Sequence, residues 1–346
     1  MKSDAYRAAG VDIDAGNRAV DLMRAAVQST YGPEVLAGIG AFGGLYDAAR
    51  LQKLKAPVLV ASTDGVGTKT KVATALGMVD GLGEDIVNHC INDILVQGAR
   101  PLFFLDYIAS SRLDPELVAR VVAGAAKACR EAGCALLGGE TAEMPGVYAP
   151  GEIDLVGTIV GWVERERIID GSAIRPGDVA IGLASSGLHT NGFSLARRVL
   201  ANEPLTGNHP ALGRPLGEAL LVPHRSYLTQ IEQMEKRGRI MGLAHLTGGG
   251  FENIVRILPA GTAVRVDPMA WPVPDLFRLI QRLGKVEEAE MYRVFNMGIG
   301  MVAFVAPEDA PAVLAAVDEP AWLIGQVVPQ GVEGERVIWP WSNLPS

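Results

Sequence analysis

The sequence has few cysteines, no long apolar run and no excess of positive charge. Its three cysteines, Cys90, Cys129 and Cys134, are too few and too irregularly spaced for a disulfide framework, and no CxxC pair suggests zinc or redox chemistry. No apolar stretch approaches the roughly 18 residues of a membrane-spanning helix. The N-terminal segment lacks the apolar core of a secretory signal. These absences predict a cytoplasmic protein that contacts no membrane.

The charge balance argues against a nucleic-acid partner. The formal net charge is −8, whereas binding to a phosphate backbone requires clustered Lys and Arg. Glycine is abundant instead, with 41 residues gathered in clusters between periodic segments. Backbone N–H groups in such turns can approach an anion closely. We therefore expect the function to lie in glycine-rich loops that hold phosphate groups and cations.

The length of 346 residues exceeds the usual limit for one hydrophobic core, so we expect two domains. In the first half, helical spacing at 17–31, 84–97 and 114–133 alternates with β-rich runs at 57–62, 102–109, 134–137 and 153–163. A charged, turn-rich segment follows at 164–178. The second half has strands near 179–185, 240–245, 262–267, 297–306 and 322–328, and helices near 192–201, 224–236, 274–284 and 308–317. The pattern predicts an α+β fold with two α/β domains, 1–170 and 171–346.

The segment TDGVGTK, residues 63–69, directly follows a predicted strand. Gly65 and Gly67 let backbone N–H groups approach an anion, Lys69 adds a positive charge, and Asp64 can hold a cation that bridges phosphate oxygens. Thr68 stands where a Walker A loop requires glycine, so this is a different phosphate loop. A tight turn with a surface lysine is the alternative.

Two further segments carry carboxylates. On the helix at 84–97, Asn88 and Asn92 share one i, i+4 column and His89 and Asp93 share another, which leaves open either metal coordination through Asp93 or a solvated helix face. Glu140 follows two glycines at a strand end, although a lone loop Glu is usually solvated. Because oxygen ligands favour Mg²⁺, Asp64, Asp93 and Glu140 form the predicted cation set.

Two loops of the second half lie between a strand and a helix. Residues 185–192, SSGLHTNG, combine hydroxyls, backbone N–H groups and a helix N-terminus, and residues 247–250, TGGG, repeat that arrangement. His189 is either a general acid or base or a structural hydrogen-bonding group. Gly38–Gly43 has GxGxxG spacing but no preceding strand, so it is a glycine-rich cover or a plain loop and not a dinucleotide site.

Several long motifs occur in the order of a known family. They are YRAAGVDIDAGN (6–17), PEVLAGIGAFGGLY (33–46), TDGVGTK (63–69), NDILVQGARPLFFLDY (92–107), GGETAEMPG (138–146), SSGLHTNGFS (185–194), AHLTGGGFENI (244–254) and MYRVFNMGIGM (291–301). End to end, the chain resembles the phosphoribosylformylglycinamidine cyclo-ligases, the AIR synthetases of purine biosynthesis. Synthetases that make selenophosphate or phosphorylate thiamin phosphate resemble GGETAEMPG and HLTGGGF less closely.

The resemblance implies a PurM-like homodimer. The N-terminal sheets of two chains would pair into a shared barrel, and each C-terminal domain would hold a sheet with packed helices. In the implied reaction, ATP phosphorylates the formyl oxygen of formylglycinamidine ribonucleotide, a substrate nitrogen attacks that carbon, and ring closure releases phosphate. The products are aminoimidazole ribonucleotide, ADP and phosphate. ATP and Mg²⁺ are required, and a need for K⁺ stays open.

The resemblance also assigns residues, by position in this sequence. Those for ATP and Mg²⁺ are Asp64, Gly65, Gly67, Thr68, Lys69, Asn92, Asp93 and Glu140, and those for the second substrate are Gly43, Gly44, Ser186, His189, Asn191, Thr247, Gly248 and Gly249. The implied catalytic residues are His189, Asp93 and Lys69. Arg24 stands where the family has a lysine, and Tyr31–Gly32 where it has a basic pair; since Arg does not deprotonate, Arg24 is assigned only a phosphate contact. A non-catalytic nucleotide-binding subunit is the alternative, against which the retained acids and His189 argue.

Overall fold

The computed structural model describes residues 10–332 and 334–341, so residues 6–9 of the first motif lie outside the described part. The chain forms two compact units. The N-terminal unit contains the chain up to Ile94, Ala99–Arg167 and, from far along the sequence, Leu220–His224. The C-terminal unit contains Leu95–Gly98, Ile168–Ala219 and the chain from Arg225 onward. The assignment of ATP binding and dimerisation to residues 1–170 stays a prediction.

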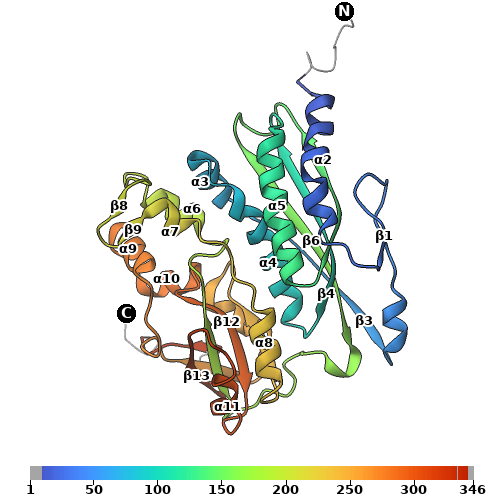
Figure 1. The fold of residues 1–346 in the computed structure, drawn as a ribbon. Helices are drawn as coiled ribbons and strands as arrows, with labels where there is room; N and C mark the ends of the chain where they lie inside the picture. Colours follow the sequence, from blue (N-terminus) through green and yellow to red (C-terminus); the bar gives the residue numbers. More distant parts are fainter. Residues whose placement is uncertain (1–9, 333, 342–346) are drawn as a thin grey trace, which may run out of the picture. The chain divides into compact units, whose positions relative to one another are not determined.

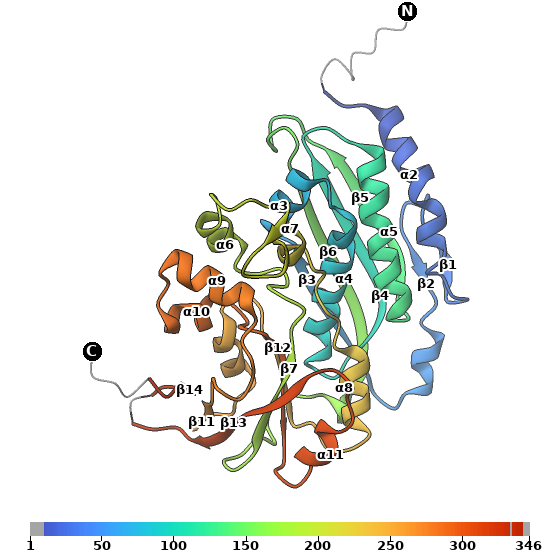
Figure 2. The ribbon, with the colours of Figure 1, turned by 60° about the vertical axis from the view of Figure 1, so that its left-hand side comes forward.

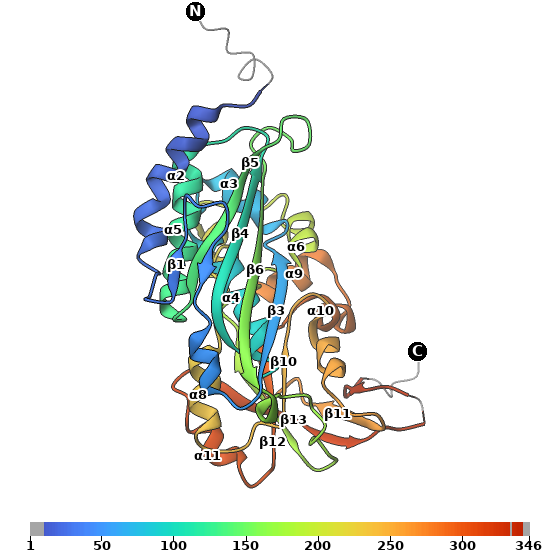
Figure 3. The same cartoon turned by 90° about the vertical axis from the view of Figure 1, so that its right-hand side faces the viewer.

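The N-terminal unit is built on a four-stranded mixed sheet of order β3-β6-β4-β5 (Figure 3). The strands are β3 (Pro57–Gly65), β6 (Ile153–Glu164), β4 (Arg100–Ser110) and β5 (Ala135–Glu143). β6 runs antiparallel to β3 and β4, and β4 runs parallel to β5. The predicted ends of two strands, at residues 62 and 137, were wrong, because the backbone pairing continues through Gly65 and Glu143. Asp64, Gly65 and Glu140 therefore lie in strands and not in the loops that follow them.

Three long helices cover one face of this sheet: α2 (Ile13–Gln28), α4 (Asp80–Leu95) and α5 (Pro115–Glu131). α5 begins as predicted, since the Asp114 carboxylate accepts from the backbone N–H groups of Glu116 and Leu117 and Pro115 occupies the first turn. Asp12 caps α2 in the same way, and its own N–H donates to Glu143. Asp12 thus has a structural role that the sequence pattern did not reveal. A shorter helix, α3 (Lys69–Leu76), follows β3.

The opposite face of the sheet carries apolar side chains with little covering them. Along β3 the residues alternate between half-buried and exposed, and Leu59 on the open face is 63% exposed. Leu59 pairs across with Trp162 of β6, and both point to the face away from the helices. The N-terminal unit also contains a small hairpin of β1 (Val35–Ala37) and β2 (Leu45–Tyr46), followed by the short helix η1 (Ala49–Lys53). The ring of Tyr46 in this hairpin packs 5.4 Å from that of Phe103.

The C-terminal unit contains a six-stranded sheet of order β10-β12-β7-β13-β11-β14 (Figures 1 and 2). Its strands are β7 (Val179–Ala184), β10 (Gly242–His245), β11 (Thr262–Val266), β12 (Ile299–Val305), β13 (Ala321–Pro329) and β14 (Val337–Ile338). All pairs are antiparallel except β11 with β14. β12 is buried along its whole length, as its continuous apolar run predicts.

The helices of this unit are α6 (Phe193–Val199), α7 (Leu216–Leu220), α8 (Leu228–Glu235), η3 (Gly250–Arg256), α9 (Asp275–Gly284), α10 (Glu288–Val294) and α11 (Ala310–Leu314), with a two-residue-per-strand hairpin β8 (Asn208–His209) and β9 (Arg214–Pro215). The prediction of an α+β fold is confirmed. Across the part of the chain that is described, no helix is both long and apolar enough to cross a membrane.

Candidate active site

Glycines in β6 let α4 sit directly on the sheet of the N-terminal unit. A Cβ added at Gly157 would lie 2.7 Å from Cγ1 of Ile86, and one at Gly161 would lie 2.5 Å from Cδ1 of Ile94, both side chains of α4. The Sγ atom of Cys90, on α4, is 3.6 Å from the carbonyl oxygen of Gly157. This close seating brings the polar residues of α4 to the end of β3 that carries Asp64.

Asp64 and Asp93 meet at a buried imidazole. Nε2 of His89 lies 3.0 Å from Oδ2 of Asp64 and 3.7 Å from Oδ2 of Asp93, while Ser62 donates to Asp93 at 3.0 Å. The side chain of His89 is 3% exposed, whereas those of Asp64 and Asp93 are 44% and 25% exposed. Burial lowers the pKa of His89, but the hydrogen bond to Asp64 and the charges of Asp93 and Asp64 outweigh it, so the pKa is raised. The two carboxylates are fixed in place and still accessible.

The polar residues of α4 are not a solvated helix face. Asn88 is 8% exposed and Asn92 is fully buried, so that alternative is wrong. Nδ2 of Asn88 donates to the carbonyl oxygen of His224 at 2.8 Å, and Nδ2 of Asn92 lies 3.2 Å from Nε2 of His224. The buried amides thus have the partners that buried polar groups require.

Lys69 is enclosed in the N-terminal unit. Its side chain and that of Asp85 are both 0% exposed, with Nζ 2.8 Å from Oδ1 of Asp85 and 2.8 Å from the carbonyl oxygen of Val222. Burial lowers the pKa of Lys69, against which the charge of Asp85 acts. The alternative of a surface lysine is wrong. A phosphate contact by Lys69 stays a prediction, and in this structure its ammonium group is engaged by Asp85 and Val222.

The turn between β3 and α3 is open. Gly67 has a φ of +67°, and no atom lies within 4 Å of a Cβ added there. Gly65 ends β3, where its N–H donates to Oδ1 of Asp64 at 2.6 Å, and Thr68 precedes α3 without a side-chain cap bond. The predicted nucleotide residues Gly65, Gly67 and Thr68 therefore lie beside Asp64 on an accessible turn.

Glu140 does not join the carboxylate pair within one chain. β3 and β5 are the opposite edges of the four-stranded sheet, about 14 Å apart at normal strand spacing. The pairing places Asp64 in one row with Gly157 and Asp106 on the helix-covered face, whereas Glu140 pairs with Tyr107 on the open face. One cation in a single chain cannot be bound by all three acids. Within one chain the structure thus separates Glu140 from Asp64 and Asp93, and the three-acid cation set stays a prediction, because a strand-end motif does not reveal which edge or face its acid occupies.

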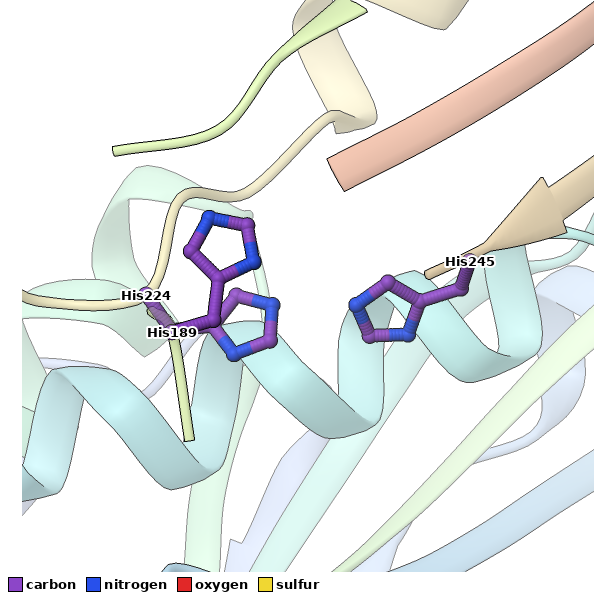
Figure 4. Close-up of side chains that lie close together, drawn as sticks. All are labelled: His189, His224 and His245. Atoms are coloured by element: carbon purple, nitrogen blue, oxygen red, sulfur yellow. The ribbon is translucent and has the colours of Figure 1, made fainter. Parts of the chain in front are cut away.

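Several residues of this site were missed by the sequence reasoning. Asp85 and His224 are both buried, and Oδ1 of Asp85 accepts from the backbone N–H of His224 at 2.7 Å. The rings of His224 and His89 are 5.1 Å apart. In Figure 4 His224 lies over the α4 helix of its own unit. The i, i+4 pair of buried amides was the available signal that a partner was needed.

In the C-terminal unit, His189 is held in the loop after β7. It is buried, has a φ of +61°, and its Nε2 accepts from the N–H of Ser186 at 3.1 Å. When neutral, His189 therefore carries its proton on Nδ1. Gly300 makes room for it, because an added Cβ there would lie 2.5 Å from Cε1 of His189. A ring nitrogen of His245, at the end of β10, comes within 4.8 Å of one of His189 (Figure 4).

The predicted substrate residues of this unit form one group. Oδ1 of Asn191 lies only 3.1 Å from the Cβ position of Gly248, and Asn253 holds the second loop by donating to the carbonyl oxygens of Gly248 and Gly250. Thr247 accepts from the N–H of Gly250 at 3.0 Å. Ser186, His189, Asn191 and Thr247–Gly249 are thus brought together. The element after Gly249 is a seven-residue 3-10 helix, so the helix contribution expected at this loop is smaller than predicted.

A cavity of about 1330 Å³ opens beside this group. Its lining combines the glycines Gly192, Gly248 and Gly249, the aromatic residues Phe251, Tyr292, Trp339 and Trp341, and the charged residues Glu252, Glu290, Arg293, Glu335 and Arg336. The rings of Trp339 and Trp341 stack 4.9 Å apart, with Tyr292 packed against both. The cavity can enclose a nucleotide-sized ligand.

Gly43 and Gly44 belong to the N-terminal unit. A Cβ at Gly44 would lie 2.3 Å from Cγ of Leu137, whereas Gly43 has open space around it. Nη1 of Arg24 is 3.7 Å from the Cβ position of Gly40, and Nη2 lies 3.3 Å from Asp21. The hairpin loop therefore packs on β5, and the roles of Gly43, Gly44 and Arg24 stay predictions.

Known proteins share this architecture. Residues 46–163 match the family model "AIR synthase related protein, N-terminal domain", and residues 175–338 match the corresponding C-terminal domain. E. coli HypE, a hydrogenase maturation protein, is 21% identical with a TM-score of 0.66, covering 91% of this chain and 94% of its own. Thiamine-monophosphate kinase from Stenotrophomonas maltophilia is 18% identical with a TM-score of 0.65, covering 93% of this chain and 96% of its own. The fold and the two family-model matches define a two-domain protein of the AIR synthase-related class.

Sequence relatives narrow the class. A phosphoribosylformylglycinamidine cyclo-ligase from Desulfitobacterium hafniense is 55% identical over 326 residues, covering 93% of this chain and 96% of its own length. Another from Geobacillus thermodenitrificans is 53% identical over 346 residues, covering 98% and 99%. The chain belongs to the phosphoribosylformylglycinamidine cyclo-ligase family, which confirms the resemblance found in its motifs.

Proposed function

We propose that this enzyme catalyses the ATP-dependent cyclisation of formylglycinamidine ribonucleotide to aminoimidazole ribonucleotide, with release of ADP and phosphate, in the cytoplasm. The observation that carries the proposal is the accessible carboxylate pair of Asp64 and Asp93, fixed on a buried His89 beside an open glycine turn. An amide-type oxygen leaves readily only after phosphorylation. The enzyme must therefore align two bound substrates and neutralise phosphate charge.

The N-terminal unit is the proposed ATP and Mg²⁺ site. Asp64 and Asp93 offer oxygen ligands alone, close together and partly exposed, which suits Mg²⁺. Bound there, Mg²⁺ would bridge phosphate oxygens and offset their charge. The backbone of Gly65–Thr68 borders the same place and would hold the nucleotide. Asn92, next to Asp93 in the sequence, is fully buried against His224, so its proposed role in nucleotide binding rests on the family resemblance. Glu140 and a requirement for K⁺ have no support in the geometry of one chain.

The C-terminal unit is the proposed site of the ribonucleotide. Asn191 of the first loop lies against Gly248 of the second, and Gly192, Gly248 and Gly249 line the cavity. His189 would take or give a proton during ring closure, held in one tautomer by the N–H of Ser186. Gly43 and Gly44 stay proposed substrate residues on the family resemblance alone.

We also propose that two chains pair through the open face of the N-terminal sheet. Leu59 and Trp162 are adjacent on that face, and Phe103 and Val160 pair across on it as well. A row of apolar side chains on an uncovered sheet face is typical of an interface. Pairing of two such sheets would make the homodimer that the family resemblance implies.

An assay of ATP consumption with candidate second substrates tests the proposed function. We expect ATP turnover with formylglycinamidine ribonucleotide and none with selenide or thiamin phosphate. Asp93→Asn should lower turnover by a hundredfold or more, since it removes a charged oxygen ligand, roughly 3 kcal/mol of transition-state stabilisation. Turnover with one of the other substrates would assign the protein to a sister activity, and ATP binding without turnover would favour a non-catalytic subunit.

A further inference from the structure

The segment Leu220–His224 is anchored in the N-terminal unit by three buried side chains. Nζ of Lys69 donates to the carbonyl oxygen of Val222 at 2.8 Å, Oδ1 of Asp85 accepts from the N–H of His224 at 2.7 Å, and Asn88 donates to the carbonyl oxygen of His224 at 2.8 Å. Lys69 and Asp85 are also paired with each other. Successive backbone groups of a segment more than 130 residues away are thereby fixed on α3 and α4.

The anchored segment places one imidazole ring. Nε2 of His224 lies 3.2 Å from Nδ2 of Asn92, and its ring packs 5.1 Å from that of His89. His89 in turn holds Asp64 at 3.0 Å. His224 thus packs against Asn92 and His89, the two residues of α4 beside the carboxylate pair.

We propose that His224 is a positioning residue for the Mg²⁺–nucleotide site, and that the Lys69–Asp85 pair is the clamp that holds it there. The proposal rests on the proposed function, because it assumes that Asp64 and Asp93 hold the metal that accompanies ATP. It gives Lys69 a role in shaping the site in place of a direct phosphate contact. Residues that orient metal ligands through a second contact typically change affinity by 10–100-fold when removed.

Two substitutions separate hydrogen bonding from packing at His224. His224→Leu fills the space of the ring with an apolar side chain of similar reach that cannot accept a hydrogen bond from Asn92. His224→Gln offers a carbonyl oxygen that can accept this hydrogen bond. We expect the dissociation constant of a non-hydrolysable ATP analogue with Mg²⁺ to rise about 10–100-fold in His224→Leu. The rise should stay within about threefold in His224→Gln. His209→Leu, in the C-terminal unit and outside the site, is the matched control and should leave binding unchanged.

The measurement is isothermal calorimetry at fixed Mg²⁺, repeated as a Mg²⁺ titration at fixed analogue, with hydrogen exchange of the peptides that contain Asp64 and Asn92. A positioning role predicts weaker binding and faster exchange in His224→Leu at an unchanged melting temperature. Wild-type affinity and exchange in His224→Leu would overturn the proposal, and so would equal losses in the Leu and Gln variants. If the wild-type protein itself binds no Mg²⁺–nucleotide, the proposed function fails, while the exchange difference still decides whether His224 orders the site.

Discussion

The buried Lys69–Asp85 pair gives the most quantitative prediction. Both side chains are fully enclosed, and Oδ1 of Asp85 receives the ammonium group and the N–H of His224. Among the described residues no donor reaches Oδ2 of Asp85. Lys69→Met therefore leaves a carboxylate without its counter-charge and the carbonyl oxygen of Val222 without its donor. Breaking a buried ion pair on one side typically costs about 3–5 kcal/mol.

The double variant Lys69→Met/Asp85→Leu provides the matched comparison. It removes both charges, so we expect it to recover all but about 1–2 kcal/mol, the value of the lost bonds to Val222 and His224. Urea denaturation followed by circular dichroism measures each variant, and a melting temperature lowered by about 10 °C should accompany Lys69→Met. A loss below about 1 kcal/mol in Lys69→Met, or a double variant as unstable as the sum of the single ones, would refute the reasoning.

The pH dependence of Lys69→Met follows from the same pair. Burial raises the pKa of Asp85 to about 6, although the charge of Lys69 opposes that rise. Without Lys69 the folded-state pKa moves further above the unfolded value, so the folded variant holds a proton that the unfolded chain has released. Its stability must then fall as the pH rises from 4 through the raised pKa. The destabilisation should be smaller at pH 5 than at pH 8, and a pH-independent difference would contradict this.

Three further substitutions test other parts of the structure. Burial raises the pKa of Asp106 to about 7, so the folded protein loses stability as pH rises from 4 to 7. Asp106→Asn should remove this pH dependence, so that its stability relative to wild type is higher at pH 8 than at pH 5 by roughly 2 kcal/mol after allowance for partial exposure. Parallel pH profiles of the two proteins would contradict this. Gly157→Ala places a Cβ 2.1 Å from Phe104 of β4 and 2.7 Å from Ile86 of α4, and should lose about 1–3 kcal/mol in urea denaturation. Gly16→Ala, with nothing within 4 Å, should gain about 0.5–1 kcal/mol. A Gly157→Ala protein as stable as wild type would show that both neighbours can move away. Leu59→Arg puts a charge on the open sheet face and should turn the proposed dimer into a monomer in sedimentation velocity, and a variant that dimerises as wild type does would place the interface elsewhere.

Much of the site could be predicted from the sequence because its signals are local. Asp64 belongs to a glycine-rich motif at the end of a strand, and Asp93 lies on a strongly periodic helix, so each could be found without tertiary information. Their meeting depends on the glycines of β6, whose lack of side chains lets α4 approach. That consequence is only visible once the strands are paired.

The missed residues depend on contacts across long stretches of chain. Asp85 reads as one more polar residue of a helix, and its partner His224 lies 139 positions away. Glu140 was grouped with Asp64 because both follow a strand-like run. Register, which decides the face, and strand order, which decides the edge, separate them. Non-local contacts to Asp85 and Val222 also enclose Lys69, which the alternative interpretation of its segment placed on the surface.

The proposed function depends on one step above all, the phosphorylation of the formyl oxygen by ATP before the ring closes. Formylglycinamidine ribonucleotide labelled with ¹⁸O in the formyl group, turned over with ATP and Mg²⁺, tests it most directly by mass spectrometry of the released phosphate. We expect one ¹⁸O atom in each phosphate, formed in step with ADP and aminoimidazole ribonucleotide. Unlabelled phosphate, with the ¹⁸O released as water, would contradict it.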